Sequence, residues 1–317
     1  MYAERPPAPD LAARIACRWQ QVAESDTVQL VVPDACVDLI WGPGGLFVAG
    51  PDTGPMPARM AAGERYAGIR FRPGAASGVF GVPLHTLRDQ RVPLADLPAA
   101  TYPGFTSLLS TTTPTTTTPT TTTPDPATDT AMLAVMHAAL DTAIRTRLGR
   151  AISPSPVAPV APAIPTAPAV PIGPNGPTVP TARTVRTART APTAPAAPVD
   201  PAVLVAPVDP AAPIIARALR TGRSVAEVAW DLGLSERQLH RRSVAAFGYA
   251  PKTLQRIVRF QRALCLARAG VPLATVAVRA GYTDQAHLSH DVKRLSGVPL
   301  RTLAPPLPPL PSAVPVR

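Results

Sequence analysis

The fold is decided by three segments near the end of the chain: LGLSERQLHRR at residues 232–242, FGYAPKTLQRIVRFQRAL at 247–264 and AGYTDQAHLSHDVKRLSGVPLRTL at 280–303. In the first and the third, a glycine ends one apolar-faced helical pattern and a polar residue begins the next. Two short helices joined by a tight, glycine-containing turn are typical of a helix-turn-helix unit. Because the pattern occurs twice, we expect two such units, linked by one long helix across the middle segment.

Polar residues at the expected helix starts support this division. Ser224 and Ser235 each stand three residues before a Glu or a Gln, which is the capping-box pattern. Thr283 is the predicted cap of the last long helix, with Asp284 as the alternative. The helix starts therefore agree with the apolar periodicity of all three segments.

The net positive charge of the chain is concentrated in the same region. The whole chain of 317 residues has a formal net charge of +11, and residues 214–303 contain 15 basic but only 5 acidic residues. Residues 1–213 contain equal numbers of basic and acidic residues. A basic helical segment of this kind is typical of a module that neutralises phosphates, although a solvated basic surface has the same composition.

The first hundred residues predict a small β-rich domain of α+β character, which we place at residues 1–105. Short helices are expected near residues 74–80 and 83–89. Four apolar runs separated by Gly and Pro are predicted strands: residues 28–32, 37–41, 46–49 and 66–71.

The middle of the chain has the composition of a disordered linker, which we place at residues 106–213. It contains a Thr/Pro tract at 110–124 and a three-residue proline repeat from Pro156, which predicts an extended spacer. One apolar-periodic stretch at about 131–150 predicts a helix, used either to pack on the N-terminal domain or to form a homodimer. Residues 304–317 are predicted to form a disordered, Pro-rich tail.

The three C-terminal segments resemble the DNA-binding domain of the AraC/XylS family of bacterial transcription regulators, over residues 214–303. This resemblance implies an all-α domain of two helix-turn-helix subdomains, whose recognition helices enter the major groove about one DNA turn apart. It implies double-stranded promoter or operator DNA as a partner, and RNA polymerase as a further one. The expected chain is thus multidomain, with a Thr/Pro-rich linker joining the β-rich and the helical domains.

The resemblance also implies which residues contact DNA. Helical phase supports it, because Arg237, His240 and Arg241 fall on the outward face, and Arg and Gln form bidentate pairs with guanine and adenine. The base-reading candidates are Arg237, His240, Arg241, Gln285, Ala286, His287 and His290. The phosphate candidates are Arg242, Lys252, Arg256, Arg259, Lys293 and Arg294.

Ser243 departs from the family pattern, which usually has Phe at this position. Helical phase from Leu239 places Ser243 on the inward face. Loss of a core Phe costs about 3–5 kcal/mol when the space is not refilled. We therefore expect Ser243→Phe to raise the melting temperature of the isolated 214–303 fragment.

Segments of the N-terminal domain resemble the companion domain of a subset of these regulators. They are CRW at residues 17–19, PDACVDLIW at 33–41 and VAGPDT at 48–53. In many relatives this companion is a β-rich module for sensing or dimerisation. A small-molecule effector at the N-terminal domain is therefore a further expected partner.

Nothing in the sequence has the pattern of a catalytic, cofactor or metal site. Cys17, Cys36 and Cys265 are far apart and lack the spacing of metal ligands. Two alternatives stay open: a DNA-repair alkyltransferase-like regulator, which needs a reactive cysteine, and a non-specific DNA-binding or structural protein, suggested by the Thr/Pro tract. Because no signal segment or long apolar run is present, we expect a cytoplasmic protein without a membrane partner.

Overall fold

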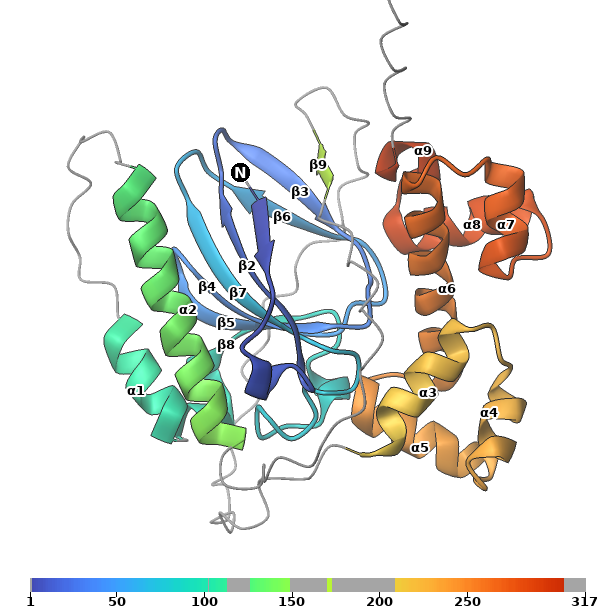
Figure 1. The fold of residues 1–317 in the computed structure, drawn as a ribbon, viewed down its shortest axis with the longest axis horizontal. Coiled ribbons are helices and arrows are strands. Elements are labelled where there is room, and N and C mark those ends of the chain that lie inside the picture. Colours follow the sequence, from blue (N-terminus) through green and yellow to red (C-terminus); the bar gives the residue numbers. More distant parts are fainter. Residues whose placement is uncertain (1, 102, 113–125, 149–169, 173–208, 305–317) are drawn as a thin grey trace, which may run out of the picture.

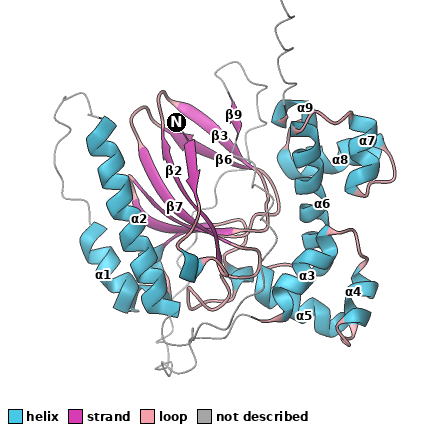
Figure 2. Ribbon diagram, viewed as in Figure 1, coloured by secondary structure: helices cyan, strands magenta, loops and turns pink. Residues whose placement is uncertain are grey.

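The computed structural model describes residues 2–101, 103–112, 126–148, 170–172 and 209–304. Within these ranges a β-rich N-terminal unit lies beside a helical C-terminal unit (Figure 1). Figure 2 shows the strands gathered in the first unit and none in the second. The expected multidomain fold, β-rich first and helical last, is confirmed for the part of the chain that is described.

A six-stranded antiparallel sheet forms the centre of the N-terminal unit, with strand order β1-β2-β7-β4-β5-β8. Its strands are β1 (Tyr2–Arg5), β2 (Ile15–Val22), β4 (Val37–Gly42), β5 (Gly45–Ala49), β7 (Arg65–Phe71) and β8 (Arg91–Pro93). A second sheet, in the order β6-β3-β9, consists of β3 (Thr27–Val31), β6 (Met56–Met60) and β9 (Val170–Ile172).

Alternation along the strands gives the larger sheet one face that is covered by helices. Ile69 and Phe71 of β7 are fully buried in a core that includes Phe105 of α1 (Pro103–Thr112). The same core includes Leu140 of α2 (Pro126–Leu148). The opposite face carries Trp19 of β2 and Arg70 of β7, and it lines the cavity described below.

Polar contacts fasten α2 to this sheet. The Arg18 guanidinium lies 3.3 Å from Asp141, and His137 Nε2 lies 2.8 Å from the carbonyl oxygen of Trp19. Arg145 forms a 2.6 Å ion pair with Asp10. The helix predicted at 131–150 is therefore present in its packing role. Both α1 and α2 pack on the core of the larger sheet, and the boundary at residue 105 stays a prediction.

The other N-terminal predictions have mixed outcomes. The four predicted strands are confirmed as β3, β4, β5 and β7. The helix expected at residues 74–80 is wrong, because Gly74 and Gly78 have positive φ and the segment forms turns. The helix expected at 83–89 is a single 3-10 turn, Leu84–Thr86.

The proline repeat contains one described element. Residues of β9 pair antiparallel with β3, where Ile172 stands opposite Val28. The remainder of the expected linker after α2, the Thr/Pro tract before it, and the expected C-terminal tail after residue 304 lie outside the described residues.

The C-terminal unit consists of seven helices in the described residues 209–304. They share one core, in which Leu254, Ile257 and Leu264 of the bridging helix are fully buried. The helices are α3 (Ala211–Arg220), α4 (Val225–Asp231), α5 (Glu236–Phe247), α6 (Pro251–Arg268), α7 (Leu273–Ala280), α8 (Gln285–Ser296) and α9 (Leu300–Leu303). The α4–α5 and α7–α8 pairs are the two expected helix-turn-helix units, and α6 links them.

The helix caps are those predicted, with one correction. Ser224 and Ser235 form complete capping boxes with Glu227 and Gln238. At α8 the cap is Asp284, whose carboxylate accepts the His287 backbone N–H at 2.7 Å, so the prediction of Thr283 is wrong. Asp284 directly precedes α8 and has an extended backbone, which brings its carboxylate to the His287 N–H, whereas Thr283 lies one residue too early to cap the helix.

Ser243 is inward, as its helical phase predicts, and its exposed fraction is 0%. Its hydroxyl donates a 2.8 Å hydrogen bond to the carbonyl oxygen of Tyr249, directly after the glycine that ends α5. Tyr249 and Phe247 fill the surrounding core. Ser243 therefore anchors the α5–α6 turn, and the expectation that Phe would stabilise this position no longer follows.

We predict that Ser243→Phe lowers the melting temperature of the full chain, because a ring at this fully buried position forces apart the turn that the hydroxyl holds. Ser243→Ala should cost only about 1 kcal/mol, the contribution of one hydrogen bond. Ser289→Ala, on the exposed face of α8, is the matched control for loss of a serine hydroxyl. A melting temperature for Ser243→Phe at or above that of the parent chain would contradict this account.

Candidate functional site

The second helix of the first helix-turn-helix unit, α5, presents a polar face to solvent. Arg237, His240 and Arg241 are all exposed, and Leu239, between them in sequence, is buried. Arg242 is also exposed, but its Nη1 lies 3.3 Å from Asp209, just before α3. The three base-reading candidates of this helix therefore share one accessible face.

The second helix of the other helix-turn-helix unit, α8, presents a corresponding polar face. Gln285, Ala286 and His290 are exposed, as are the phosphate candidates Lys293 and Arg294 in its last turn. His287 differs, because it is only half-exposed and its ring meets that of Tyr282 edge-on at 5.2 Å. Part of the His287 ring therefore packs against Tyr282 and is not accessible to solvent.

Asp291 is a functional residue that the sequence did not single out. It is 5% exposed on the inward face of α8 and lies between two arginines of α6. Arg259 Nη2 is 3.0 Å from Asp291 Oδ2, and Arg256 Nε is 3.6 Å from Asp291 Oδ1. The Arg259 guanidinium also lies 4.4 Å from the centre of the Tyr282 ring.

These contacts involve two of the phosphate candidates. Arg256 and Arg259 of α6 pair with Asp291 of α8, and their assignment to phosphates stays a prediction. Other basic candidates have no such pairing. Within residues 209–304, no acidic side chain pairs with the basic candidates Arg237, Arg241, Lys252, Lys293 and Arg294.

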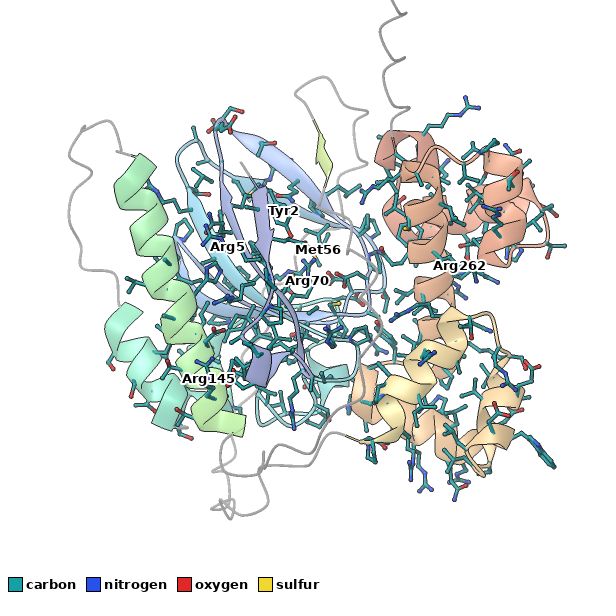
Figure 3. The ribbon with its side chains drawn as sticks, viewed as in Figure 1. Tyr2, Arg5, Met56, Arg70, Arg145 and Arg262 are labelled. Carbon is teal, nitrogen blue, oxygen red and sulfur yellow. The ribbon has the colours of Figure 1, made fainter. Side chains whose placement is uncertain are left out.

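The N-terminal unit contains a cavity of about 570 Å³ between its two sheets. Aromatic side chains from the larger sheet line it, among them Tyr2, Trp19 and Tyr66. Met56 of the smaller sheet forms part of the opposite wall. Figure 3 labels Tyr2, Met56 and Arg70 on the part of this unit that lies between α2 and the C-terminal helices.

Charged groups form the inner end of this cavity. Asp38 accepts bonds from Nε and Nη2 of Arg70, the latter at 2.9 Å, and also from the Trp19 indole at 3.2 Å. Asp52 accepts two bonds from Arg91, at 2.9 and 2.7 Å. Both arginines are therefore already held by carboxylates.

The turn at residues 33–36 lies between the cavity and the C-terminal unit. Asp34 lines the cavity, and its Oδ1 accepts the Cys36 backbone N–H at 2.8 Å. Ala35 has a φ of +68° and is buried in the core of the C-terminal helices. The carbonyl oxygen of Pro33 accepts a 2.6 Å bond from the amide of Gln261 in α6. Gln261 itself reaches the cavity wall.

Other contacts join the two units beside this turn. A Cβ on Gly248, which caps α5 with a φ of +83°, would lie 2.7 Å from Pro51 and 3.0 Å from the Leu84 carbonyl oxygen. Tyr249 is buried next to it, and its hydroxyl has no hydrogen-bond partner among the described residues. Burial raises the pKa of Tyr249 well above its usual range, and nearby carboxylates including Asp34 add to this.

The cysteines have the environment of packed side chains. Burial raises the pKa of Cys17 to about 12 and that of Cys36 well above its usual range. Burial thus disfavours the thiolate form of both cysteines, whereas the alkyl-transfer alternative needs a reactive cysteine. Among the described residues, no three His, Cys, Asp or Glu side chains gather as a metal site would need, and no helix has the length and apolarity to cross a membrane.

Two family models match the chain. Residues 229–304 match a helix-turn-helix domain, and residues 3–93 match a domain of unknown function, DUF6597. No curated protein gives a match.

Solved structures give distant similarities. The C-terminal domain of AraT, a response regulator from Geobacillus stearothermophilus, is 19% identical, covers 34% of this chain and 97% of its own, and has a TM-score of 0.31. ToxT from Vibrio cholerae is 7% identical, covers 95% of this chain and 98% of its own, and has a TM-score of 0.39.

The Asp291 contact leads to a stability prediction. Asp291→Ala should lower the free energy of unfolding by about 1.5–3 kcal/mol, because it leaves the part-buried Arg259 without its charged hydrogen bond. Asp231→Ala removes an exposed pair with Arg223 and should cost at most about 1 kcal/mol. Urea denaturation of both variants measures the difference. Equal losses for the two would show that Asp291 does not hold α8 in place.

Proposed function

We propose that this chain, whose C-terminal unit is an AraC-type helix-turn-helix domain, is a sequence-specific regulator of transcription that reads two adjacent major-groove sites. The observation that carries the proposal is the repetition of α5 and α8. Each is a capped helix of 12 residues that exposes polar side chains beside an inward apolar face. The excess of basic residues in this unit supplies attraction to phosphates at both helices.

The exposed side chains suggest a division of roles. We assign Arg237 and Arg241 to guanine, whose O6 and N7 match the guanidinium fork, and Gln285 to adenine. Ala286 would contact a thymine methyl group. His240 and His290 complete the two reading faces, and His287 contributes the exposed part of its ring.

We assign the phosphate contacts to basic side chains that have no acidic partner. Lys252 at the start of α6, and Lys293 and Arg294 at the end of α8, are exposed and without acidic partners in the described part of the unit. Arg242 can join them if its contact with Asp209 opens. Phosphate contacts position the protein, whereas base contacts select the sequence.

We further propose that a small-molecule effector occupies the N-terminal cavity and changes DNA binding. The volume of about 570 Å³ lies within the range of small-ligand sites. Gln261, on the helix between the two readers, supports this, because it contacts the turn beside the cavity. DNA-bound protein would act through RNA polymerase in the cytoplasm.

Selection from random duplex DNA with the full chain, followed by sequencing, tests this function. We expect a motif of two parts whose centres lie about 10 base pairs apart. Arg237→Ala should reduce preference at one part only, by about 1–3 kcal/mol for the base it contacts. Gln285→Ala should do the same at the other part.

Arg5→Ala is the matched control, because it removes the same charge from an exposed position on β1. It should leave the motif unchanged. Enrichment of no motif, or loss of preference that is uniform over both parts in Arg237→Ala, would reduce the function to non-specific DNA binding.

A further inference from the structure

Carboxylates outnumber arginines at the inner end of the N-terminal cavity. Arg70 faces Asp38 at 2.9 Å, Asp34 at 3.7 Å and Glu4 at 3.8 Å. Arg91 faces Asp52. Glu4 lies outside the cavity lining, so within the cavity two guanidinium groups face three carboxylates, those of Asp34, Asp38 and Asp52. Arg59, the other basic residue of the wall, is exposed at the rim on β6.

Asp34 is the carboxylate that this arrangement leaves in excess. Its Oδ1 is used by the Cys36 N–H, whereas its Oδ2 approaches only Arg70 Nε, at 3.7 Å, a nitrogen that already donates to Asp38. Burial raises the pKa of Asp34 to about 6 against the opposing effect of Arg70, and Asp38 and Asp52 add to the rise. The Asp34 side chain is 20% exposed, so it is accessible from the cavity, and a carboxylate with so little compensation favours a cationic partner.

The rest of the cavity suits a large apolar body. The rings of Tyr2 and Trp19 lie 6.1 Å apart on one wall, and Phe47 and Ile40 extend this wall. Aromatic faces attract organic cations, especially where water is excluded. An anion would be disfavoured beside Arg70 and Arg91, because it could reach either only by displacing a carboxylate, and Arg59 lies apart from them on the exposed part of β6.

We propose that the cavity binds an organic cation with an aromatic or apolar body, and that the Asp34 carboxylate holds the cationic group. We propose further that binding is coupled to the DNA-binding helices through the turn at residues 33–36. The proposal that the ligand is an organic cation depends only on the residues of the cavity, and it does not depend on the proposed function. The proposed coupling between ligand binding and DNA binding rests on the proposed function, because it is measured as a change in DNA affinity.

The coupling is proposed because the turn at residues 33–36 contacts both the cavity and the C-terminal helices. Asp34 faces the cavity, Ala35 is buried against the C-terminal helices, and Pro33 accepts the bond from Gln261. The left-handed φ of Ala35 is unfavourable for a residue with a side chain, so this conformation is maintained by its surroundings. A cation that draws Asp34 toward itself therefore acts directly on the contact with α6.

Tetraphenylphosphonium and tetraphenylborate test the ligand class, because they have nearly the same shape and opposite charge. Titration calorimetry with the full chain, without DNA, should show that the phosphonium binds and that the borate binds at least about ten-fold more weakly. Asp34→Asn keeps the oxygen that accepts the Cys36 N–H, and it should weaken phosphonium binding by about ten-fold or more. Asp96→Asn, an exposed acid on the same unit, should bind as the parent does.

Three outcomes would overturn this ligand class. The first is a dissociation constant for the phosphonium weaker than about 1 mM. The second is equal affinity for the two ions, and the third is unchanged affinity in Asp34→Asn. Met56→Trp, which narrows the cavity from the opposite wall, provides a second test, since phosphonium binding that survives it lies outside the cavity. Thermal melting of each variant confirms that it is folded.

The coupling is tested by the affinity for the enriched duplex with and without saturating phosphonium. We expect the dissociation constant of the DNA to change by at least about three-fold in the parent and to stay constant in Asp34→Asn, since coupling between two sites is reciprocal. Constant DNA affinity in the parent, with phosphonium bound, would overturn the coupling and leave the ligand class intact. Failure to enrich any duplex would refute the proposed function, and the calorimetry would still decide the ligand class.

Discussion

Burial of one helix, α6, is the constraint on which the rest of this structure depends. Its apolar side chains Leu254, Ile257 and Leu264 are inaccessible to solvent because α3, α5 and α7 to α9 pack around them. Both helix-turn-helix units are thereby attached to a single rod. Their relative position follows from packing on α6, since neither unit is large enough to bury its own core.

The polar contacts of α6 fix the orientation of its neighbours, which non-directional apolar packing does not. Arg256 and Arg259 orient α8 through Asp291, and Gln261 joins the rod to the N-terminal unit through Pro33. Basic residues in a DNA-binding domain are commonly assigned to phosphates from sequence. Here Arg256 and Arg259 of the rod pair with Asp291 of α8, whereas Lys252, Lys293 and Arg294 lie near helix ends and have no acidic partner in the described part of this unit.

How much the sequence revealed differs between the two units. Caps, turn glycines and apolar periodicity are local signals, so they predicted α4 to α8 and the outward face of α5 correctly. Ser243 showed the limit of this reasoning, because phase gave its burial but not the hydrogen bond to Tyr249. The choice of Asp284 over Thr283 depended in the same way on a contact that spacing cannot distinguish.

In the N-terminal unit the decisive contacts are long-range. The strand β2, IACRWQQV, mixes Arg and Gln with apolar residues, and its role is clear only when Arg18 meets Asp141 of α2 and Trp19 meets Asp38. The cavity and its excess carboxylate arise from residues on all eight strands from β1 to β8, on the segments between them and on α6. No motif within one segment carries that information, so Asp34 and Gln261 emerged only from the structure.

The most direct measure of the central claim is the pattern of DNA protection by the full chain. Hydroxyl-radical footprinting on an enriched duplex should show two protected patches on one face of the helix, about one turn apart, because α5 and α8 are held on the same rod. A single patch, or protection spread evenly along the duplex, would contradict the claim that two helices of this unit read adjacent sites.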